Sequence, residues 1–171
     1  NAEWPQTGGY ANHAMHHIKV PKAIGRAWRT SIGEGSDDDR RLIAQPIMAQ
    51  GRIFTMDSET RVSAFDSRSG GEIWSVELVP EEEEDDSHIG GGLAFERGRV
   101  YVATGFAQVM ALDAGTGKVI WRRDLGAPMR TAPTARGNRV FVLTVTNKLH
   151  ALHGATGKTL WTHSGIEETT N

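Results

Sequence analysis

The sequence predicts an all-β protein, a β-propeller of four-stranded antiparallel blades, present as a partial ring of about three blades and one closing strand. Three copies of one pattern predict this fold, each running from an alanine through a glycine-containing turn to a tryptophan. The copies are Ala64–Trp74, Ala111–Trp121 and Ala151–Trp161. Their tryptophans are 47 and then 40 residues apart, and a period of about 40 residues is typical of a propeller blade.

The chain begins with residues that stand outside the repeat. Residues 1–26 contain no copy of the pattern, and we expect an N-terminal extension that passes over the surface. Residues 27–33 include Ala27-Trp28-Arg29 and resemble the end of an outer strand, although no inner strands precede them. We therefore expect an outer strand that closes a blade built elsewhere.

Each repeat contains four short strand patterns. In the first blade, residues 45–78, a short apolar run and a β-branched and aromatic run are followed by two segments that alternate between polar and apolar residues. Alternation of this kind is typical of half-buried strands. The same reading gives a second blade at 91–125 and a third at 131–164. An acidic loop, 79–90, separates the first two, and residues 165–171 begin a connection to a further blade.

The turn inside each copy has a structural role. An aspartate at its start can accept hydrogen bonds from backbone N–H groups, and the glycine supplies a left-handed conformation. Four residues later, a tryptophan on the outer strand can cover apolar area between neighbouring blades. The residues that this pattern assigns to blade docking are Trp28, Trp74, Trp121, Trp161, Asp66, Asp113, Gly70, Gly117 and Gly157. In the third copy His153 replaces the aspartate, and we interpret it as a tolerated change at an exposed turn.

Composition restricts the class of function. The net charge is −2, which predicts no general basic surface for nucleic acid. Hydrophobic residues make up 38% of the chain, without an apolar run long enough to cross a membrane. There is no cysteine, which suits the periplasm and equally permits the cytoplasm.

Two charged segments could bind a partner. The first is Glu81, Glu82, Glu83, Glu84, Asp85 and Asp86. A solvated, self-repelling loop is the favoured interpretation, and a docking site for a basic partner or a weak cation site is the alternative. The second segment, Asp37–Arg41, has mixed charges and is interpreted in the same way.

A histidine cluster near the N-terminus is a weak candidate for metal binding. On a helix, His13 would share a face with His16 and His17, in a geometry that can hold zinc. Nothing else in the sequence marks a site there, so we favour surface histidines and predict no metal centre. No catalytic triad, nucleophile elbow or phosphate loop is present, and no catalytic residue is predicted.

The repeat also resembles a known family. Its pattern Asp-Ala-x-Thr-Gly-Lys-x-x-Trp, seen at 113–121, is similar to the tryptophan-docking repeat of pyrroloquinoline-quinone (PQQ)-type β-propellers, which include quinoprotein alcohol dehydrogenases and the outer-membrane assembly lipoprotein BamB. Residues 4–9 and 27–35 resemble the mature start of BamB-like proteins. The resemblance implies an eight-bladed ring whose last blade is completed by the N-terminal strand, and this chain would be its first part.

The resemblance implies a function as well. It suggests a non-enzymatic periplasmic scaffold of the outer-membrane β-barrel assembly (BAM) machinery, anchored by a lipid outside this chain and without a cofactor. The implied partners are BamA, through its periplasmic POTRA domains, and unfolded outer-membrane protein clients. We also expect self-association or strand exchange, because unpaired strand edges and bare blade faces associate readily.

Two other function classes stay open. One is a fragment of a PQQ-dependent quinoprotein oxidoreductase, whose family implies a calcium ion, an acidic base, a stacking tryptophan and, in the alcohol dehydrogenases, a disulfide between adjacent cysteines. This chain has no cysteine for that disulfide. The other is a propeller binding module of another envelope process.

Overall fold

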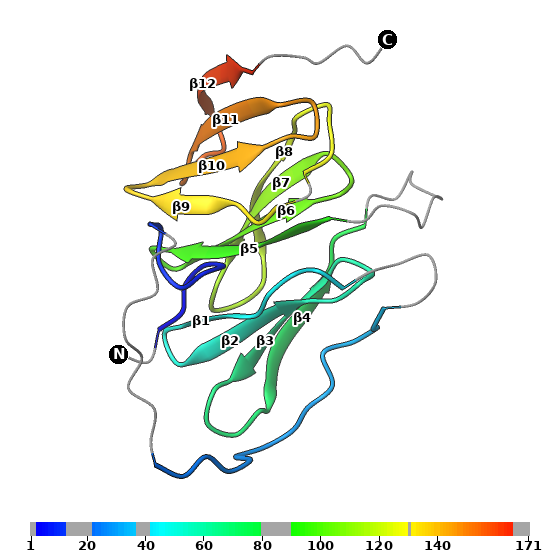
Figure 1. Ribbon diagram of the computed structural model, residues 1–171, viewed down its shortest axis with the longest axis vertical. Helices are drawn as coiled ribbons and strands as arrows, with labels where there is room; N and C mark the ends of the chain where they lie inside the picture. The colour runs from blue at the N-terminus through cyan, green and yellow to red at the C-terminus, as the bar shows by residue number, and fades with distance from the viewer. Residues whose placement is uncertain (1–2, 13–21, 37–41, 80–89, 130, 166–171) are drawn as a thin grey trace.

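The computed structural model describes residues 3–12, 22–36, 42–79, 90–129 and 131–165. They form twelve strands in three four-stranded antiparallel sheets, which follow one another as the blades of a partial propeller (Figure 1). The predicted all-β fold is therefore confirmed. No helix in the described part of the chain is long and apolar enough to cross a membrane.

The strands run through each blade in chain order. The first blade contains β1 (Ile47–Ala49), β2 (Arg52–Met56), β3 (Arg61–Asp66) and β4 (Glu72–Glu77). The second contains β5 (Gly91–Glu96), β6 (Arg99–Thr104), β7 (Gln108–Asp113) and β8 (Val119–Asp124). The third contains β9 (Thr134–Arg136), β10 (Arg139–Leu143), β11 (Lys148–His153) and β12 (Thr159–Ser164). Each sheet is a simple meander. The first strands of neighbouring blades, β1, β5 and β9, contact one another in turn, so the first strand of each blade is the inner one and the last strand the outer one.

A bulge recurs on the outer strand of every blade. The pairing register shifts at the same place in each sheet, between Ala64 and Phe65 and at the two equivalent positions. The extra residue is Ile73, Ile120 or Leu160, which directly precedes the tryptophan and is 43–44% exposed in all three blades. Because a bulge re-aims the next side chain and increases strand twist, it directs each tryptophan toward the following blade.

The core lies between the blades. One cluster joins the first and second blades, with the fully buried Phe54 and Leu93 among its members. A second cluster joins the second and third blades around Tyr101, Met129 and Leu152. The middle strands of the second blade, β6 and β7, therefore bury one face against the preceding blade and the other against the following blade. This explains why residues 100–103 and 109–112 are all apolar.

The segment 27–33 is the predicted closing strand of a blade built elsewhere, and its pairing in that blade stays a prediction. It forms no β-strand, because a strand requires a hydrogen-bonded neighbour and no described strand lies beside it. It is part of an extended stretch, residues 22–36, that runs alongside the first blade (Figure 1). Its tryptophan nevertheless contacts the first blade, as shown below.

Candidate functional site

The three turns between the last two strands of each blade share one geometry. In the second blade, Asp113 Oδ1 accepts hydrogen bonds from the N–H groups of Gly115 and Thr116 and from the Thr116 hydroxyl, at 2.9–3.0 Å. The backbone closes around the turn, since Gly117 N donates to the Asp113 carbonyl at 2.8 Å. The hydrogen bond from the Thr116 hydroxyl, followed by those from the backbone, lowers the pKa of Asp113. The carboxylate is thus used to hold the turn.

The same construction appears in the first blade and is adapted in the third. Asp66 accepts from Arg68 N, Ser69 N and the Ser69 hydroxyl, and the hydrogen bonds from Ser69 lower its pKa. In the third blade, His153 Nδ1 lies 3.0 Å from the Thr156 hydroxyl, and its Nε2 lies 3.0 Å from the Asn138 side chain. The imidazole therefore contacts the turn and the neighbouring hairpin.

Each of these turns receives a tryptophan from the preceding segment. Trp74 Nε1 donates to the Ala114 carbonyl at 3.1 Å, and Trp121 Nε1 donates to the Gly154 carbonyl at 2.8 Å. The accepting residue directly follows the aspartate or histidine of the turn. The indole covers the turn glycine so closely that a Cβ on Gly117 would lie 2.6 Å from the Trp74 ring. Glycine is required there both for this approach and for its φ of +74°.

Trp28 makes the equivalent contact on the first blade. Its Nε1 donates to the Ser67 carbonyl at 3.1 Å, and its ring would lie 2.6 Å from a Cβ on Gly70. Trp161 lies on the outer strand of the third blade with 45% of its surface exposed, whereas Trp121 is 9% exposed. The tryptophans predicted for docking thus divide into three that contact a turn of the described chain and one that lies open.

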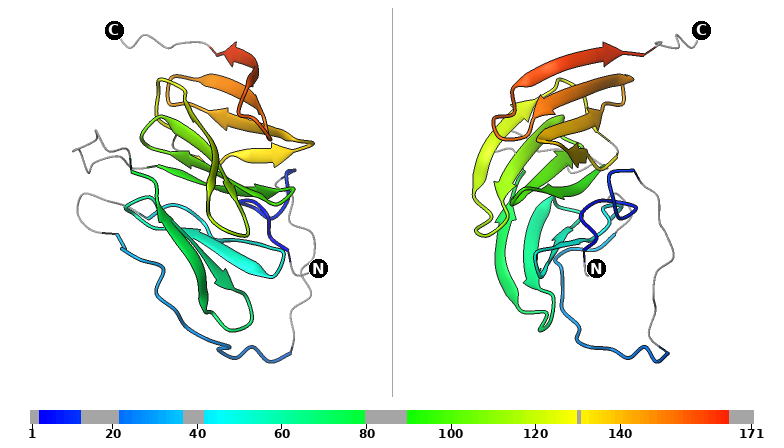
Figure 2. Two further views of the ribbon diagram at one scale, coloured as in Figure 1. Left: turned by 180° about the vertical axis from the view of Figure 1, so that it is seen from behind. Right: turned by 90° about the vertical axis from the view of Figure 1, so that its left-hand side faces the viewer.

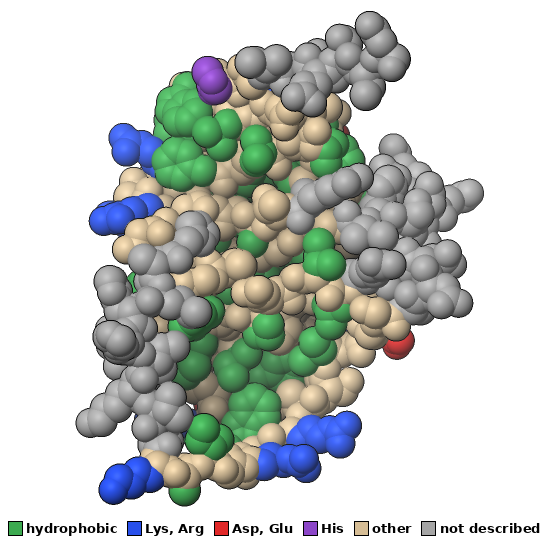
Figure 3. Space-filling model, viewed as in Figure 1, with side chains coloured by type: hydrophobic (Ala, Val, Ile, Leu, Met, Phe, Trp, Pro, Cys, Tyr) green, Lys and Arg blue, Asp and Glu red, His purple; other side chains and the backbone are tan. Residues whose placement is uncertain are grey.

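The open tryptophan belongs to a larger apolar surface. Within each blade an aromatic residue of the second strand lies about 6 Å from the tryptophan, as at Phe54–Trp74, Tyr101–Trp121 and Phe141–Trp161. In the first two blades the next blade covers this pair. We call Phe141, Leu143, Val145 and Trp161 the third-blade face, and Leu143, Val145 and Trp161 are 43–46% exposed. Figure 3 shows hydrophobic side chains gathered at this end of the molecule.

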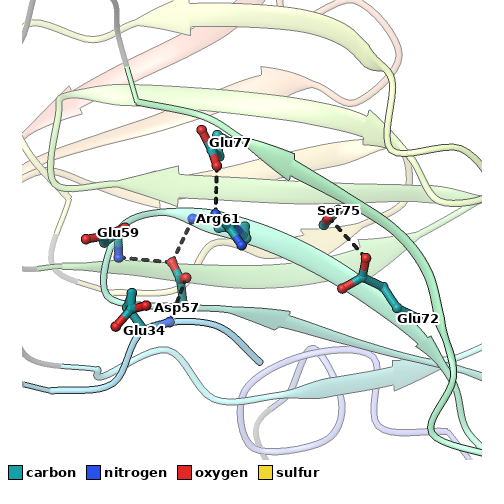
Figure 4. Close-up of polar contacts among 7 residues, drawn as sticks. All are labelled: Glu34, Asp57, Glu59, Arg61, Glu72, Ser75 and Glu77. Carbon is teal, nitrogen blue, oxygen red and sulfur yellow. Dashed lines mark hydrogen bonds and ion pairs between the residues drawn. The ribbon is translucent and has the colours of Figure 1, made fainter. Parts of the chain in front are cut away.

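Asp57 ties the extended N-terminal stretch to the first blade. Its Oδ1 accepts from Glu59 N and Arg61 N at 2.9 and 2.8 Å, and its Oδ2 accepts from Glu34 N at 3.1 Å (Figure 4). The side chain is 4% exposed. The close approach leaves no room for a side chain at Gly33, whose φ is +112°. Asp57 therefore fixes the stretch that carries Trp28.

A second N-terminal segment, residues 4–9, crosses the inner strands of all three blades, and we call it the N-terminal strap. At the first blade Trp4 and Met48 exchange two backbone hydrogen bonds, at 2.6 and 2.8 Å. At the second blade Phe95 N donates to the Pro5 carbonyl at 2.7 Å. At the third blade the Gln6 side chain completes the series. Figure 2 shows the strap on the side of the inner strands, away from β4 and β8.

The Gln6 amide behaves as a strand partner. Its Nε2 donates to the Ala135 carbonyl at 2.7 Å, and its Oε1 accepts from Ala135 N at 3.0 Å. The side chain is 4% exposed. Ala135, Phe95 and Met48 occupy equivalent positions of the repeat, so three consecutive residues of the strap bind the same point in three blades.

A cleft of about 510 Å³ lies beside the strap. Pro5 and Gln6 form one wall, and Phe95 and Ala135 of the inner strands contribute to its lining. Tyr10, Arg97 and Arg136 also line it and are exposed. The acidic residues Glu3 and Glu96 line it as well, and Glu96 accepts hydrogen bonds from the backbone N–H groups of Gly137 and Asn138.

Several predicted candidates lie outside the described residues. These are the histidines His13, His16 and His17, the acidic residues Glu81–Asp86 and the mixed-charge segment Asp37–Arg41. Among the described residues, no three His, Cys, Asp or Glu side chains gather as a metal site would require. The strap and Asp57 were not assigned a site role from the sequence. The available signal was the resemblance of residues 4–9 to BamB-like proteins, which does not indicate the strands that this segment contacts.

Comparison with known proteins identifies the family to which the chain is similar. A family model described as outer membrane protein assembly factor BamB matches residues 58–171, which are 114 of the 171 residues. The chain is 30% identical over 110 residues to the outer membrane protein assembly factor BamB of Escherichia coli K12, covering 63% of this chain and 28% of that protein. It is also 34% identical over 113 residues to the quinohemoprotein alcohol dehydrogenase ADH IIB of Pseudomonas putida, covering 64% and 16%.

Solved structures support the fold. BamB from Moraxella catarrhalis superposes with a TM-score of 0.56 at 22% identity, covering 67% of this chain and 33% of that one. The quinohemoprotein alcohol dehydrogenase ADHIIG of Pseudomonas putida HK5 superposes with a TM-score of 0.74 at 24% identity, covering 94% and 26%. The chain spans less than a third of the length of the two sequence relatives named above.

Proposed function

Because the chain belongs to the PQQ-type repeat family described as outer membrane protein assembly factor BamB, we propose that it forms part of a non-enzymatic scaffold of the BAM machinery. The family match over residues 58–171 is the observation that carries this proposal. The scaffold acts by binding. It holds partner-contacting loops and faces in fixed positions on a rigid set of blades.

The way in which the repeat residues are used supports a scaffold. The aspartates, glycines and three of the tryptophans of the repeat serve the turns and the blade contacts. Partner binding therefore falls to the segments between strands and to exposed faces, as is common when function is carried by loops on a rigid framework. The acidic segment 81–86 is the candidate loop for a basic partner.

The proposed location is the periplasm, at the outer membrane, through a lipid anchor outside this chain. The proposed partners are a BamA-like assembly protein and unfolded outer-membrane protein clients. In the isolated chain we also propose self-association through the third-blade face.

The test is cross-linking of the full-length protein in its native bacterial envelope, followed by affinity capture and mass spectrometry. The expected result is specific recovery of a BamA-like barrel protein together with other lipoproteins of the assembly machinery. A matched capture with an unrelated periplasmic lipoprotein at equal abundance sets the background. Recovery of a redox partner in place of the barrel protein would overturn the proposal.

The relatives that are dehydrogenases favour a second candidate, a PQQ-dependent oxidoreductase. The identity to the Pseudomonas putida enzyme, 34%, is slightly higher than the 30% identity to BamB. The described residues of this chain offer no cluster of three metal-ligating side chains and no cysteine, so we assign no catalytic step to them. Titration of the full-length protein with PQQ and calcium, followed by absorbance, tests this candidate. Saturable binding at micromolar concentration would favour the enzyme over the scaffold.

A further inference from the structure

The cleft beside the N-terminal strap has the size of a ligand site and lies apart from the blade-docking turns. Its volume of about 510 Å³ lies within the roughly 300–1,000 Å³ that small-ligand sites occupy. It opens where the strap passes from the second blade to the third, next to the hairpins β5–β6 and β9–β10. The chemistry of its lining indicates what it would hold.

The backbone beside the cleft is already paired. On β9, the backbone N–H and C=O groups of Ala135 are both hydrogen-bonded to the Gln6 side chain. Just beyond that strand, Gly137 N donates to Glu96. On β5, Phe95 N donates to the strap. A ligand in the cleft would therefore be recognised by side chains rather than by adding a strand to the sheet.

The lining carries two basic and two acidic side chains, and the two basic ones are available for recognition. Arg97 and Arg136 line the cleft, and neither forms an ion pair within the described part of the chain. The Glu96 carboxylate, on the same lining, accepts hydrogen bonds from two backbone amides, those of Gly137 and Asn138. Guanidinium groups bind carboxylates with paired hydrogen bonds, which are stronger than neutral ones. Glu3 on the same lining is exposed and opposes an anion.

One aromatic side chain of the lining is available to a ligand. Tyr10 is 42% exposed although it is large and partly apolar, whereas the half-buried Phe95 ring stacks on Phe54 of the first blade, with 6.1 Å between the ring centroids. Exposed aromatic residues beside arginines are the composition that protein-binding surfaces favour. We propose that this cleft binds an acidic peptide segment in which a carboxylate side chain stands next to an aromatic residue. Arg97 and Arg136 hold the carboxylate, and Tyr10 contacts the aromatic residue beside it.

Fluorescence anisotropy with a labelled acetyl-Phe-Asp-Phe-amide peptide tests the proposal on the intact chain. Its uncharged counterpart, acetyl-Phe-Asn-Phe-amide, is the matched probe. We expect the aspartate peptide to bind at least about tenfold more tightly, the difference that 1.4 kcal/mol produces. Added salt should reduce this difference, because the arginines are exposed. Equal affinity of the two peptides would overturn the proposal.

Variants locate the site. The double variant Arg97→Gln/Arg136→Gln should weaken binding of the aspartate peptide about tenfold or more, while Arg29→Gln/Arg68→Gln, at two exposed arginines outside the cleft, should leave it unchanged. Glu3→Gln should strengthen binding. All of these positions are exposed, so an unchanged thermal unfolding curve serves as the control for folding. Equal loss in both double variants would show general charge attraction and would refute the site.

This inference stands apart from the proposed scaffold function. The peptide assay uses purified chain and a synthetic probe, whereas the scaffold is tested by recovery of an envelope partner. If the chain does not bind the peptide but the envelope partner is recovered normally, only the cleft proposal is refuted. The reverse outcome would leave the cleft proposal standing and remove the scaffold.

Discussion

At the scale of single residues, the contact between tryptophan and turn carries much of the blade packing. Trp121 is almost fully buried against the third blade, whereas Trp161 has the same place in the repeat and is 45% exposed. We predict that Trp121→Ala lowers the free energy of unfolding by about 3–5 kcal/mol, as expected for a large buried aromatic residue. Trp161→Ala is the matched control and should cost only about 1 kcal/mol, for its contact with Phe141. Urea denaturation measures both, and equal losses would contradict a docking role.

The turn glycines allow the backbone effect to be separated from the packing effect. Gly98 and Gly117 both have a φ of +74°, but a Cβ on Gly98 would meet nothing within 4 Å, whereas one on Gly117 would meet the Trp74 ring. Gly98→Ala should therefore cost about 1–2 kcal/mol for the left-handed backbone alone. Gly117→Ala should cost about 1–3 kcal/mol more, from overpacking against the indole. Similar losses in chemical denaturation would show that the indole moves aside freely.

The turn carboxylates predict a dependence of stability on pH. The pKa of Asp113 is lowered in the folded protein, chiefly by the Thr116 hydroxyl, so the folded state favours the charged form. Its contribution to stability is therefore complete above the unfolded pKa of about 4 and is lost as the pH falls through the lower folded value. In Asp113→Asn this loss is absent. The difference in melting temperature between wild type and variant should shrink as the pH falls from 5 to about 2. A constant difference over this range would exclude the carboxylate charge as its cause.

Residue-scale features were predictable where they are local. The aspartate or histidine, the glycine and the tryptophan of each repeat lie within 9 residues, so their spacing in the sequence already describes their geometry. Gln6 and Ala135 are 129 residues apart, and no local pattern links them. The cleft was missed for the same reason, because it depends on where the strap lies.

At the scale of elements, the strap shows how a short segment can fix three blades at once. Its three contacts differ in chemistry: paired backbone groups, one carbonyl and one side-chain amide. They meet the same repeat position each time, so the strap fixes the spacing of the inner strands. The segment 27–33 has no strand partner and is instead held by Trp28 and Asp57. Its outer-strand pattern was visible in the sequence, but its pairing depends on a neighbour that the described residues do not include.

The Gln6 contact can be tested directly. Gln6→Met preserves the length of the side chain and removes the amide, which leaves Ala135 N–H and C=O unpaired in a buried place. We predict a loss of about 1–3 kcal/mol in unfolding free energy. Hydrogen exchange at the Ala135 amide should also become faster. The control is Gln108→Met, where the side chain bonds the exposed Arg122 and little stability should be lost. Unchanged exchange at Ala135 would show that the strap is not held by this amide.

At the scale of the whole molecule, the two ends of the blade stack are unequal. The first blade has its docking turn filled by Trp28 of the same chain. The third blade presents an aromatic pair and exposed aliphatic side chains at positions that the second blade buries, as Leu143 at 46% exposure and Ala103 at 0% show. An apolar face of this kind marks an interaction surface. In the isolated chain we expect its occupant to be the same face of a second copy.

This expectation can be tested with two variants of equal exposure. Leu143→Glu places a charge on the third-blade face, and Ile120→Glu places one at an outer-strand bulge of the second blade, where the residue is 44% exposed. Sedimentation velocity over a range of concentrations should show a dimer whose Kd rises at least about tenfold in Leu143→Glu and stays unchanged in Ile120→Glu, because burying an unpaired carboxylate opposes only the contact that covers it. If both variants weaken association equally, net charge rather than this face controls it. A strictly monomeric wild type would show that exposed aromatic and aliphatic groups at the end of the stack do not drive pairing of two copies.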